Sequence, residues 1–149
     1  MLKTLLGLLI AITLLAGSVL AQPVAGSVQG IAAPMSMPSQ LVVYYFHGNA
    51  RCPSCYKLEQ FAKEALEQNF ANELKSGKIV FKIVNIDKPG NDHFVVDYQL
   101  YTKSVIISLV KDGKQVQYKN LEKVWDLLRD QNQYHAYVRD EIKLFLGEL

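Results

Sequence analysis

Residues 41–66 read LVVYYFHGNARCPSCYKLEQFAKEAL, and this stretch decides the fold of the chain. Leu41 to Phe46 form an unbroken run of apolar, β-branched and aromatic residues, which is typical of a central strand covered on both faces. Pro53 follows the first of two cysteines, and proline favours the first turn of a helix. Apolar residues then recur at helical spacing, at Leu58, Phe61, Ala62, Ala65 and Leu66. The stretch predicts a buried strand, a short loop and an amphipathic helix that begins beside the cysteines.

The rest of the chain continues with alternating strand and helix patterns separated by turn residues. Asp92 is placed to cap a short helix, and Asp112-Gly113 is typical of the centre of a hairpin turn. The predicted elements are the first helix fading near Leu74 before Gly77, a buried strand over 79–86, a short helix after Asp92, a strand over 105–110, its hairpin partner over 115–118, and helical structure from Leu121 to Leu146 interrupted around 131–133.

This order predicts the fold class. The first strand, helix and strand form a crossover unit, whose two strands should be parallel. The later hairpin adds an antiparallel edge. We therefore expect an α/β fold with three layers, in which a central mixed four-stranded sheet carries helices on both faces. A chain of 149 residues has room for one such domain, which we place at residues 39–149.

The first 21 residues have a different character. Lys3 supplies a positive start, residues 4–20 carry no charge, and Val19-Leu20-Ala21 ends the stretch with short side chains, as in a secretory signal peptide. The alternative is an uncleaved anchor, since about 18 apolar residues can just span a bilayer. We expect a signal peptide over 1–21, a flexible linker over 22–38, and a mature domain that is periplasmic or extracellular, without stable membrane insertion once the signal is cleaved.

Composition excludes some classes of partner. Half of the residues are hydrophobic and a fifth are charged, as in a packed globular protein. The formal net charge is only +2, and the basic residues are spread along the chain. No strip of Lys and Arg indicates binding to nucleic acid. We expect a monomer.

The two cysteines, Cys52 and Cys55, stand only three positions apart. Disulfides persist in an oxidising compartment, but a bridge across so short a loop constrains the unfolded chain very little. A structural role therefore explains the pair poorly. Its place between a buried strand and a helix favours a chemical role.

Cys52 is expected at the N-terminus of the helix, where unpaired backbone N–H groups and the helix dipole stabilise an anion. Arg51 adds a neighbouring positive charge, and Ser54 offers a hydroxyl donor. These groups predict a pKa of Cys52 below the free value of about 8.5. The thiolate is the attacking species in thiol–disulfide exchange. Cys55 lies one helical turn further on the same side, where it would be more buried and would resolve the mixed disulfide.

Metal binding is the main alternative for the same two sulfurs. Zinc usually takes four ligands, and the missing ones would have to come from His47, His93 and His135, which belong to three separate elements. We therefore assign no metal site. Soft Cu(I) or arsenite needs only two or three thiolates, so a non-catalytic binder of a thiophilic metal or metalloid stays open. A third interpretation is an interaction module with a vestigial disulfide.

The span from Leu41 to about Asn120 resembles thioredoxin-fold proteins element by element. Residues 84–91, VNIDKPGN, resemble the thioredoxin stretch that leaves the second core strand, and residues 110–114, VKDGK, resemble its late hairpin. Residues 45–48, YFHG, followed by RCPSC at 51–55, resemble more closely a small exported family labelled nitrophenyl compound nitroreductase subunit. The resemblance implies a dithiol–disulfide oxidoreductase that needs no cofactor and exchanges electrons with protein thiols, disulfides and a redox partner protein.

Three positions depart from the thioredoxin pattern. Arg51 stands where thioredoxins have tryptophan, and Phe46 stands where they bury an acidic residue. Val105 stands where they have a cis-proline facing the cysteines. A cis bond without proline costs about 2.5–4 kcal/mol, so we expect a trans bond there. The substrate-binding residues that the resemblance implies are Pro53, Ser54, Ser104 and Val105.

Two further side chains near the cysteines are open to more than one interpretation. His47 lies five residues before Cys52 and is a candidate for proton transfer. Its alternative is a loop histidine bonded to a nearby carbonyl. We interpret Trp125 as a packing residue that anchors the last helix, with a ligand platform as the alternative, and His93 and His135 as helix-surface residues. The motif does not set the direction of electron flow, because the reduction potential depends on how far the thiolate is stabilised.

Overall fold

The structure is a computed structural model that describes residues 38–149, so the expected signal peptide and nearly all of the linker lie outside the described residues. Its strands and helices follow the expected order. They are β1 (Gln40–His47), α1 (Pro53–Asn69), α2 (Ala71–Ser76), β2 (Ile79–Asn85), α3 (His93–Asp97), β3 (Ser104–Lys111), β4 (Lys114–Asn120), the 3-10 segments η1 (Glu122–Val124) and η2 (Asp126–Arg129), and α4 (Gln131–Leu146). None of the helices in this part of the chain has the length and hydrophobicity that crossing a bilayer requires.

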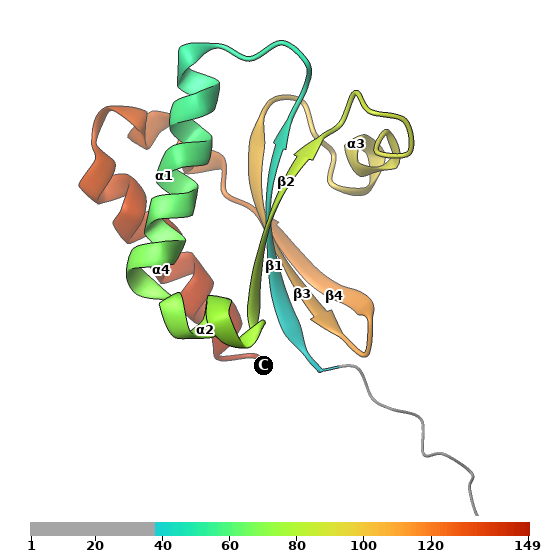
Figure 1. The fold of residues 1–149 in the computed structure, drawn as a ribbon, viewed down its shortest axis with the longest axis vertical. Coiled ribbons are helices and arrows are strands. Elements are labelled where there is room, and N and C mark those ends of the chain that lie inside the picture. Colours follow the sequence, from blue (N-terminus) through green and yellow to red (C-terminus); the bar gives the residue numbers. More distant parts are fainter. Residues whose placement is uncertain (1–37) are drawn as a thin grey trace, which may run out of the picture. The chain divides into compact units, whose positions relative to one another are not determined.

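The four strands form one mixed sheet in the order β2-β1-β3-β4. β1 pairs in parallel with β2 and antiparallel with β3, and β3 pairs antiparallel with β4. Figure 1 shows α1 and α4 on one side of this sheet and α3 on the other. The expected α/β class is confirmed: this is the thioredoxin-like arrangement, with three layers and a mixed four-stranded sheet.

The two faces of β1 explain its unbroken apolar sequence. Side chains alternate across a strand, so Leu41, Val43 and Tyr45 enter the main core with α1 and α4. Phe46 points the other way, into a smaller cluster with Tyr98 and Leu100, two residues that come shortly after α3 in the sequence. A strand buried on both faces needs apolar side chains at nearly every position.

β2 is the strand for which the sequence prediction was wrong. It was expected to be buried, yet it lies at the edge of the sheet, where Lys82 and Ile83 are exposed. An apolar run does not distinguish a central strand from an edge strand, because the position in the sheet depends on which strands pair.

The helical regions also differ in detail from the expectation. The first helix breaks at Phe70, whose side chain is buried, and α2 then ends at Gly77 with φ of 77°, a left-handed conformation suited to glycine. Asp92 occupies the position before α3, but its side chain makes no capping hydrogen bond. The helical region is interrupted as expected, but at Asp130 and not over 131–133, which form the first turn of α4. The Asp130 carboxylate accepts a hydrogen bond from the Gln133 backbone N–H and caps α4.

The hairpin between β3 and β4 agrees with the prediction. Asp112 and Gly113 have φ of 51° and 74°. Positive φ at both central residues is what a two-residue hairpin turn with the right twist requires.

Candidate functional site

The reactive pair lies where the chain leaves β1 and enters α1. Cys52 is the N-cap residue of α1, Pro53 opens the helix, and Cys55 is its third residue. Cys52 is exposed, whereas Cys55 is only 1% exposed, as the sequence predicted. Both are free thiols, and their Sγ atoms lie 2.6 Å apart. The geometry presents one sulfur to solvent and holds the second directly behind it.

Hydrogen bonds at the helix start lower the pKa of Cys52 below its ordinary value. The largest contribution is the hydrogen bond between the two thiols, followed by the backbone N–H of Cys55. The backbone N–H groups of Cys52 and Ser54 add smaller contributions. In return, the Cys52 N–H donates to Cys55 Sγ at 3.2 Å. The expected direction of the shift is confirmed, and Ser54 contributes its backbone N–H where its hydroxyl was expected.

The guanidinium of Arg51 contacts groups of α1, and its effect on the Cys52 thiolate stays a prediction. It pairs with the carboxylate of Glu59, one turn beyond Cys55, and stacks over the ring of Tyr56 at 4.1 Å from its centroid. The Arg51 and Glu59 side chains are only 16% and 24% exposed. Arg51 is not among the largest causes of the lowered pKa of Cys52, which are the Cys55 thiol and nearby backbone N–H groups.

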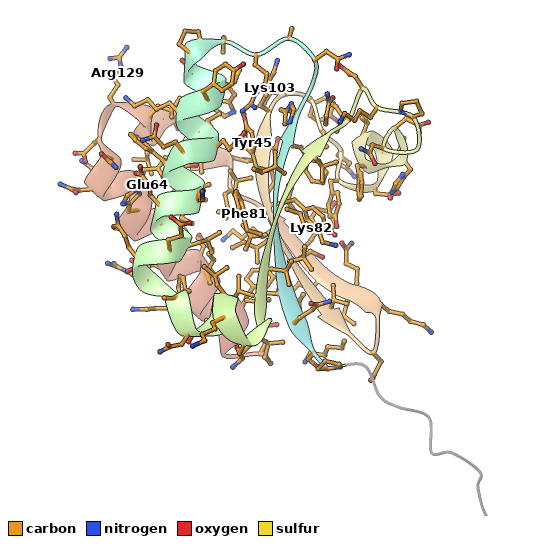
Figure 2. All side chains as sticks on the ribbon, in the orientation of Figure 1. Tyr45, Glu64, Phe81, Lys82, Lys103 and Arg129 are labelled. Atoms are coloured by element: carbon orange, nitrogen blue, oxygen red, sulfur yellow. The ribbon has the colours of Figure 1, made fainter. Side chains whose placement is uncertain are left out.

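Tyr45 was interpreted from the sequence as a residue of the core strand only, yet it also contacts the site. Its side chain is fully buried, and its hydroxyl donates a 2.6 Å hydrogen bond to the backbone carbonyl of Cys55. Figure 2 shows Tyr45 between α1 and the sheet. Burial raises the pKa of Tyr45 to about 12, so it stays protonated and keeps donating at neutral pH. The alternation of β1, which points Tyr45 toward the helix, was the available signal.

His47 is the last residue of β1. Its Nδ1 lies 2.9 Å from the Gly48 carbonyl oxygen, and its ring stacks on Tyr45 at 5.9 Å between centroids. The interpretation as a histidine bonded to a nearby carbonyl is confirmed. Among the described residues it makes no hydrogen bond to either sulfur. A role in proton transfer stays a prediction.

The four predicted substrate-binding residues fall into two groups. Pro53 and Ser54 are exposed beside Cys52. Ser104 and Val105 are buried, with exposures of 3% and 0%, and the Ser104 hydroxyl donates to the Thr102 carbonyl. Their side chains are thus closed to a substrate, and any contact there has to involve the backbone or the loop before β3. Within residues 38–149 no peptide bond is cis, so the expectation of a trans bond at Val105 is confirmed.

Trp125 contacts the loop before β3 and lines a hollow beside the CPSC motif. It stands between η1 and η2, packs against the main core, and donates its indole N–H to the Lys103 carbonyl at 2.9 Å. Its ring also lines a surface hollow of about 550 Å³ together with Ser54 of the CPSC motif. The packing interpretation is confirmed, and the contact with the loop before β3 is an addition to it.

The other histidines lie away from the cysteines. His93 is exposed, as expected, and its Nδ1 lies 2.8 Å from the Gly90 carbonyl. His135 was expected on the surface, but its side chain is only 12% exposed because it packs against Phe61 and faces Glu64. No group of three or more His, Cys, Asp and Glu side chains within residues 38–149 could hold a metal ion.

Comparisons with known proteins find similarity in structure alone. No protein-family model matches the chain, and no curated protein sequence matches it. Thioredoxin O2 from Arabidopsis thaliana is 18% identical, covers 64% of this chain and 76% of its own, and has a TM-score of 0.39. Fasciola hepatica thioredoxin is 21% identical over 64% of this chain and 81% of its own, at a TM-score of 0.38. Thioredoxin from Trypanosoma brucei brucei is 21% identical over 70% of this chain and 76% of its own, at a TM-score of 0.39.

Scores at this level add nothing to the fold assignment, which rests on the order and directions of the strands. They also lend no support to the resemblance to the family labelled nitrophenyl compound nitroreductase subunit. The chain has a thioredoxin-like fold with a cysteine pair, Cys52 and Cys55, at the start of α1.

Proposed function

We propose that this chain is an exported thiol–disulfide oxidoreductase that exchanges electrons with the thiols of partner proteins. Cys52 is the nucleophile and Cys55 the resolving cysteine. The observation that supports this assignment is the exposed Sγ of Cys52, at the N-terminus of α1, 2.6 Å from the buried Sγ of Cys55. Backbone N–H groups and a neighbouring thiol favour the charged form of the attacking sulfur.

The reaction with a substrate disulfide takes two displacements. The Cys52 thiolate attacks one substrate sulfur, forms a mixed disulfide and expels the other sulfur as a thiolate. Cys55 then loses its proton to a released thiolate and attacks Cys52 Sγ, which breaks the mixed disulfide and frees the second substrate thiolate. The substrate gains two electrons, and the protein ends with a Cys52–Cys55 disulfide. The same steps in reverse oxidise a substrate dithiol.

The chain's own residues hold the pair for this chemistry. The Tyr45 hydroxyl fixes the carbonyl of Cys55, and the Arg51–Glu59 ion pair fastens the residue before Cys52 to α1. The mixed disulfide therefore forms on a helix start that is tied to β1. Because the two sulfurs already lie close together, the resolving step needs little movement.

Turnover tests this proposal. The full-length chain should reduce insulin or reactivate scrambled ribonuclease, and Cys52→Ser should abolish both activities. Cys55→Ser should instead accumulate a mixed disulfide that a mass spectrum detects. A glutathione series then gives the reduction potential: about −270 mV indicates a reductase and about −120 mV an oxidant.

Addition of Cu(I) or arsenite separates the alternative function. Tight binding of either with negligible disulfide exchange would replace the enzyme proposal by the alternative, a non-catalytic binder of a thiophilic metal or metalloid. Export is tested on its own, by expression in a bacterium and mass spectrometry of the periplasmic fraction. The expected product begins at Gln22, and a full-length, membrane-bound chain would contradict cleavage.

A further inference from the structure

We infer that the hollow beside Cys52 binds an acidic segment of the substrate polypeptide. We call it the basic hollow, and it is lined by Ser54, Lys57, Trp125, Asp126, Leu128 and Arg129. This inference rests on the proposed function and names the kind of substrate that the site takes. Three properties of the hollow support the inference: its position beside the CPSC motif, its net charge and the tryptophan in its wall.

The place of the hollow joins it to the reactive sulfur. Ser54 belongs to the CPSC motif and also lines the hollow, so a chain seated there lies beside the motif that carries Cys52. The hollow measures about 550 Å³, room for a few side chains of an extended segment. Polar and charged residues form most of its lining, which suits a polypeptide better than a buried apolar ligand.

The charge of the hollow favours acidic partners. Lys57 and Arg129 are exposed, and within residues 38–149 neither forms an ion pair with an acidic side chain. Figure 2 shows Arg129 projecting away from the ribbon. Arg51, by contrast, has its charge compensated by Glu59. The lining holds one acid, Asp126, against two cations, so the hollow keeps a net positive charge.

Trp125 gives the hollow a rigid wall. Its indole N–H is already used by the Lys103 carbonyl, which fixes the ring in place. The ring therefore offers apolar contact area that loses little side-chain entropy when a substrate binds. An acidic segment can place its carboxylates on Lys57 and Arg129 while its chain rests on the indole.

Two model substrates test the inference on the full-length, reduced chain. Each is a ten-residue peptide carrying one cysteine as a mixed disulfide with 2-mercaptoethanol, flanked by Asp and Glu in one peptide and by Lys in the other. At low ionic strength we expect the acidic peptide to react about tenfold faster than the basic one, because complementary charge raises the encounter rate. The ratio should approach one at high salt, since ions screen exposed charges.

Charge variants locate the effect. Lys57→Gln combined with Arg129→Gln should abolish the preference for the acidic peptide. The matched control, Lys75→Gln with Lys78→Gln, removes two exposed charges from α2 and the turn after it and should keep the preference. Figure 1 shows α2 beyond the end of α1 that is far from the cysteines. Rates with the neutral disulfide of 2-mercaptoethanol normalise each variant for any change in thiolate reactivity.

The outcomes separate this inference from the proposed function. Equal rates for the two peptides, with normal turnover of the neutral disulfide, would overturn the basic hollow and leave the oxidoreductase intact. A preference that survives the Lys57 and Arg129 substitutions would also overturn it. Failure to react with any disulfide would overturn both.

Discussion

The hydroxyl of Tyr45 donates a 2.6 Å hydrogen bond to the backbone carbonyl of Cys55, and this buried contact joins β1 to the first turn of α1. It is the point where the sheet holds the helix that carries the cysteines. The bond leaves the Cys55 side chain facing Cys52 Sγ. The orientation of the resolving cysteine thus depends on a residue ten positions earlier in the chain.

Replacing Tyr45 by Phe tests the importance of this contact. Tyr45→Phe keeps the packing of the ring and removes only the hydroxyl, so we expect a loss of about 1–2 kcal/mol in the free energy of unfolding. The resolving step should also slow, because the first turn of α1 is held less firmly. Urea unfolding measures the first effect and the lifetime of the mixed disulfide the second. Tyr44→Phe is the matched control, and an equal effect from it would show that the Cys55 contact has no special role.

Removing the second sulfur tests the cause of the shifted pKa of Cys52. The thiol of Cys55 is the largest contributor, so Cys55→Ala should raise the pKa of Cys52 while the backbone N–H groups keep it below the free value of about 8.5. Iodoacetamide alkylation measured against pH gives this pKa directly. A pKa in Cys55→Ala equal to that of the wild type would show that the helix start alone stabilises the thiolate.

The lowered pKa of Cys52 also sets a pH dependence for the reduced protein. Because the folded state binds this proton less tightly than the unfolded chain, the stabilisation is complete above the free-thiol pKa of about 8.5. It is lost as the pH falls through the lower folded pKa. The free energy of unfolding of the reduced wild type, minus that of Cys52→Ser, should therefore rise with pH across this window. A difference that is flat from pH 5 to 9 would contradict the linkage.

Arg51→Gln should affect stability more than reactivity. The substitution leaves the Glu59 carboxylate without its partner in a largely covered site, and we expect a loss of about 1–2 kcal/mol, between the values for exposed and buried ion pairs. The pKa of Cys52 should change less than it does in Cys55→Ala, since the Cys55 thiol is the largest cause of the shift and Arg51 is not among the largest. The double variant Arg51→Gln with Glu59→Gln should lose less free energy of unfolding than the two single variants lose together. A large rise in the Cys52 pKa on Arg51→Gln would restore the role that the sequence suggested.

Alkaline pH should destabilise the fold through the half-buried Tyr44 and the buried Tyr45. Burial raises the pKa of Tyr44 and of Tyr45 to about 12, above the value of about 10 in an unfolded chain. The folded state holds these protons more tightly, so their contribution is complete below pH 10 and is lost as the pH rises through 12. The free energy of unfolding should fall over this window, and it should fall less in Tyr44→Phe. Denaturant titrations followed by circular dichroism from pH 8 to 12 measure both.

The sequence by itself determined the layers of the fold and the place of the cysteines. The apolar run Leu41 to Phe46, the proline after Cys52 and the Asp112-Gly113 turn each report a local requirement: burial on two faces, a helix start and positive φ. Each of these requirements involves only residues that are neighbours in the sequence. The direction of the Cys52 pKa shift was predictable for the same reason, because the groups that cause it, the Cys55 thiol and the N–H groups of Cys52, Ser54 and Cys55, lie within four consecutive residues.

Only the tertiary structure decided which side chains meet. It placed β2 at the sheet edge, turned Arg51 toward Glu59, set the Tyr45 hydroxyl on the Cys55 carbonyl and brought Trp125 to Lys103. These partners are up to 22 positions apart, and several alternatives satisfy the same local pattern equally well. The choice among them follows from how strands pair and helices pack, which involves the whole chain at once.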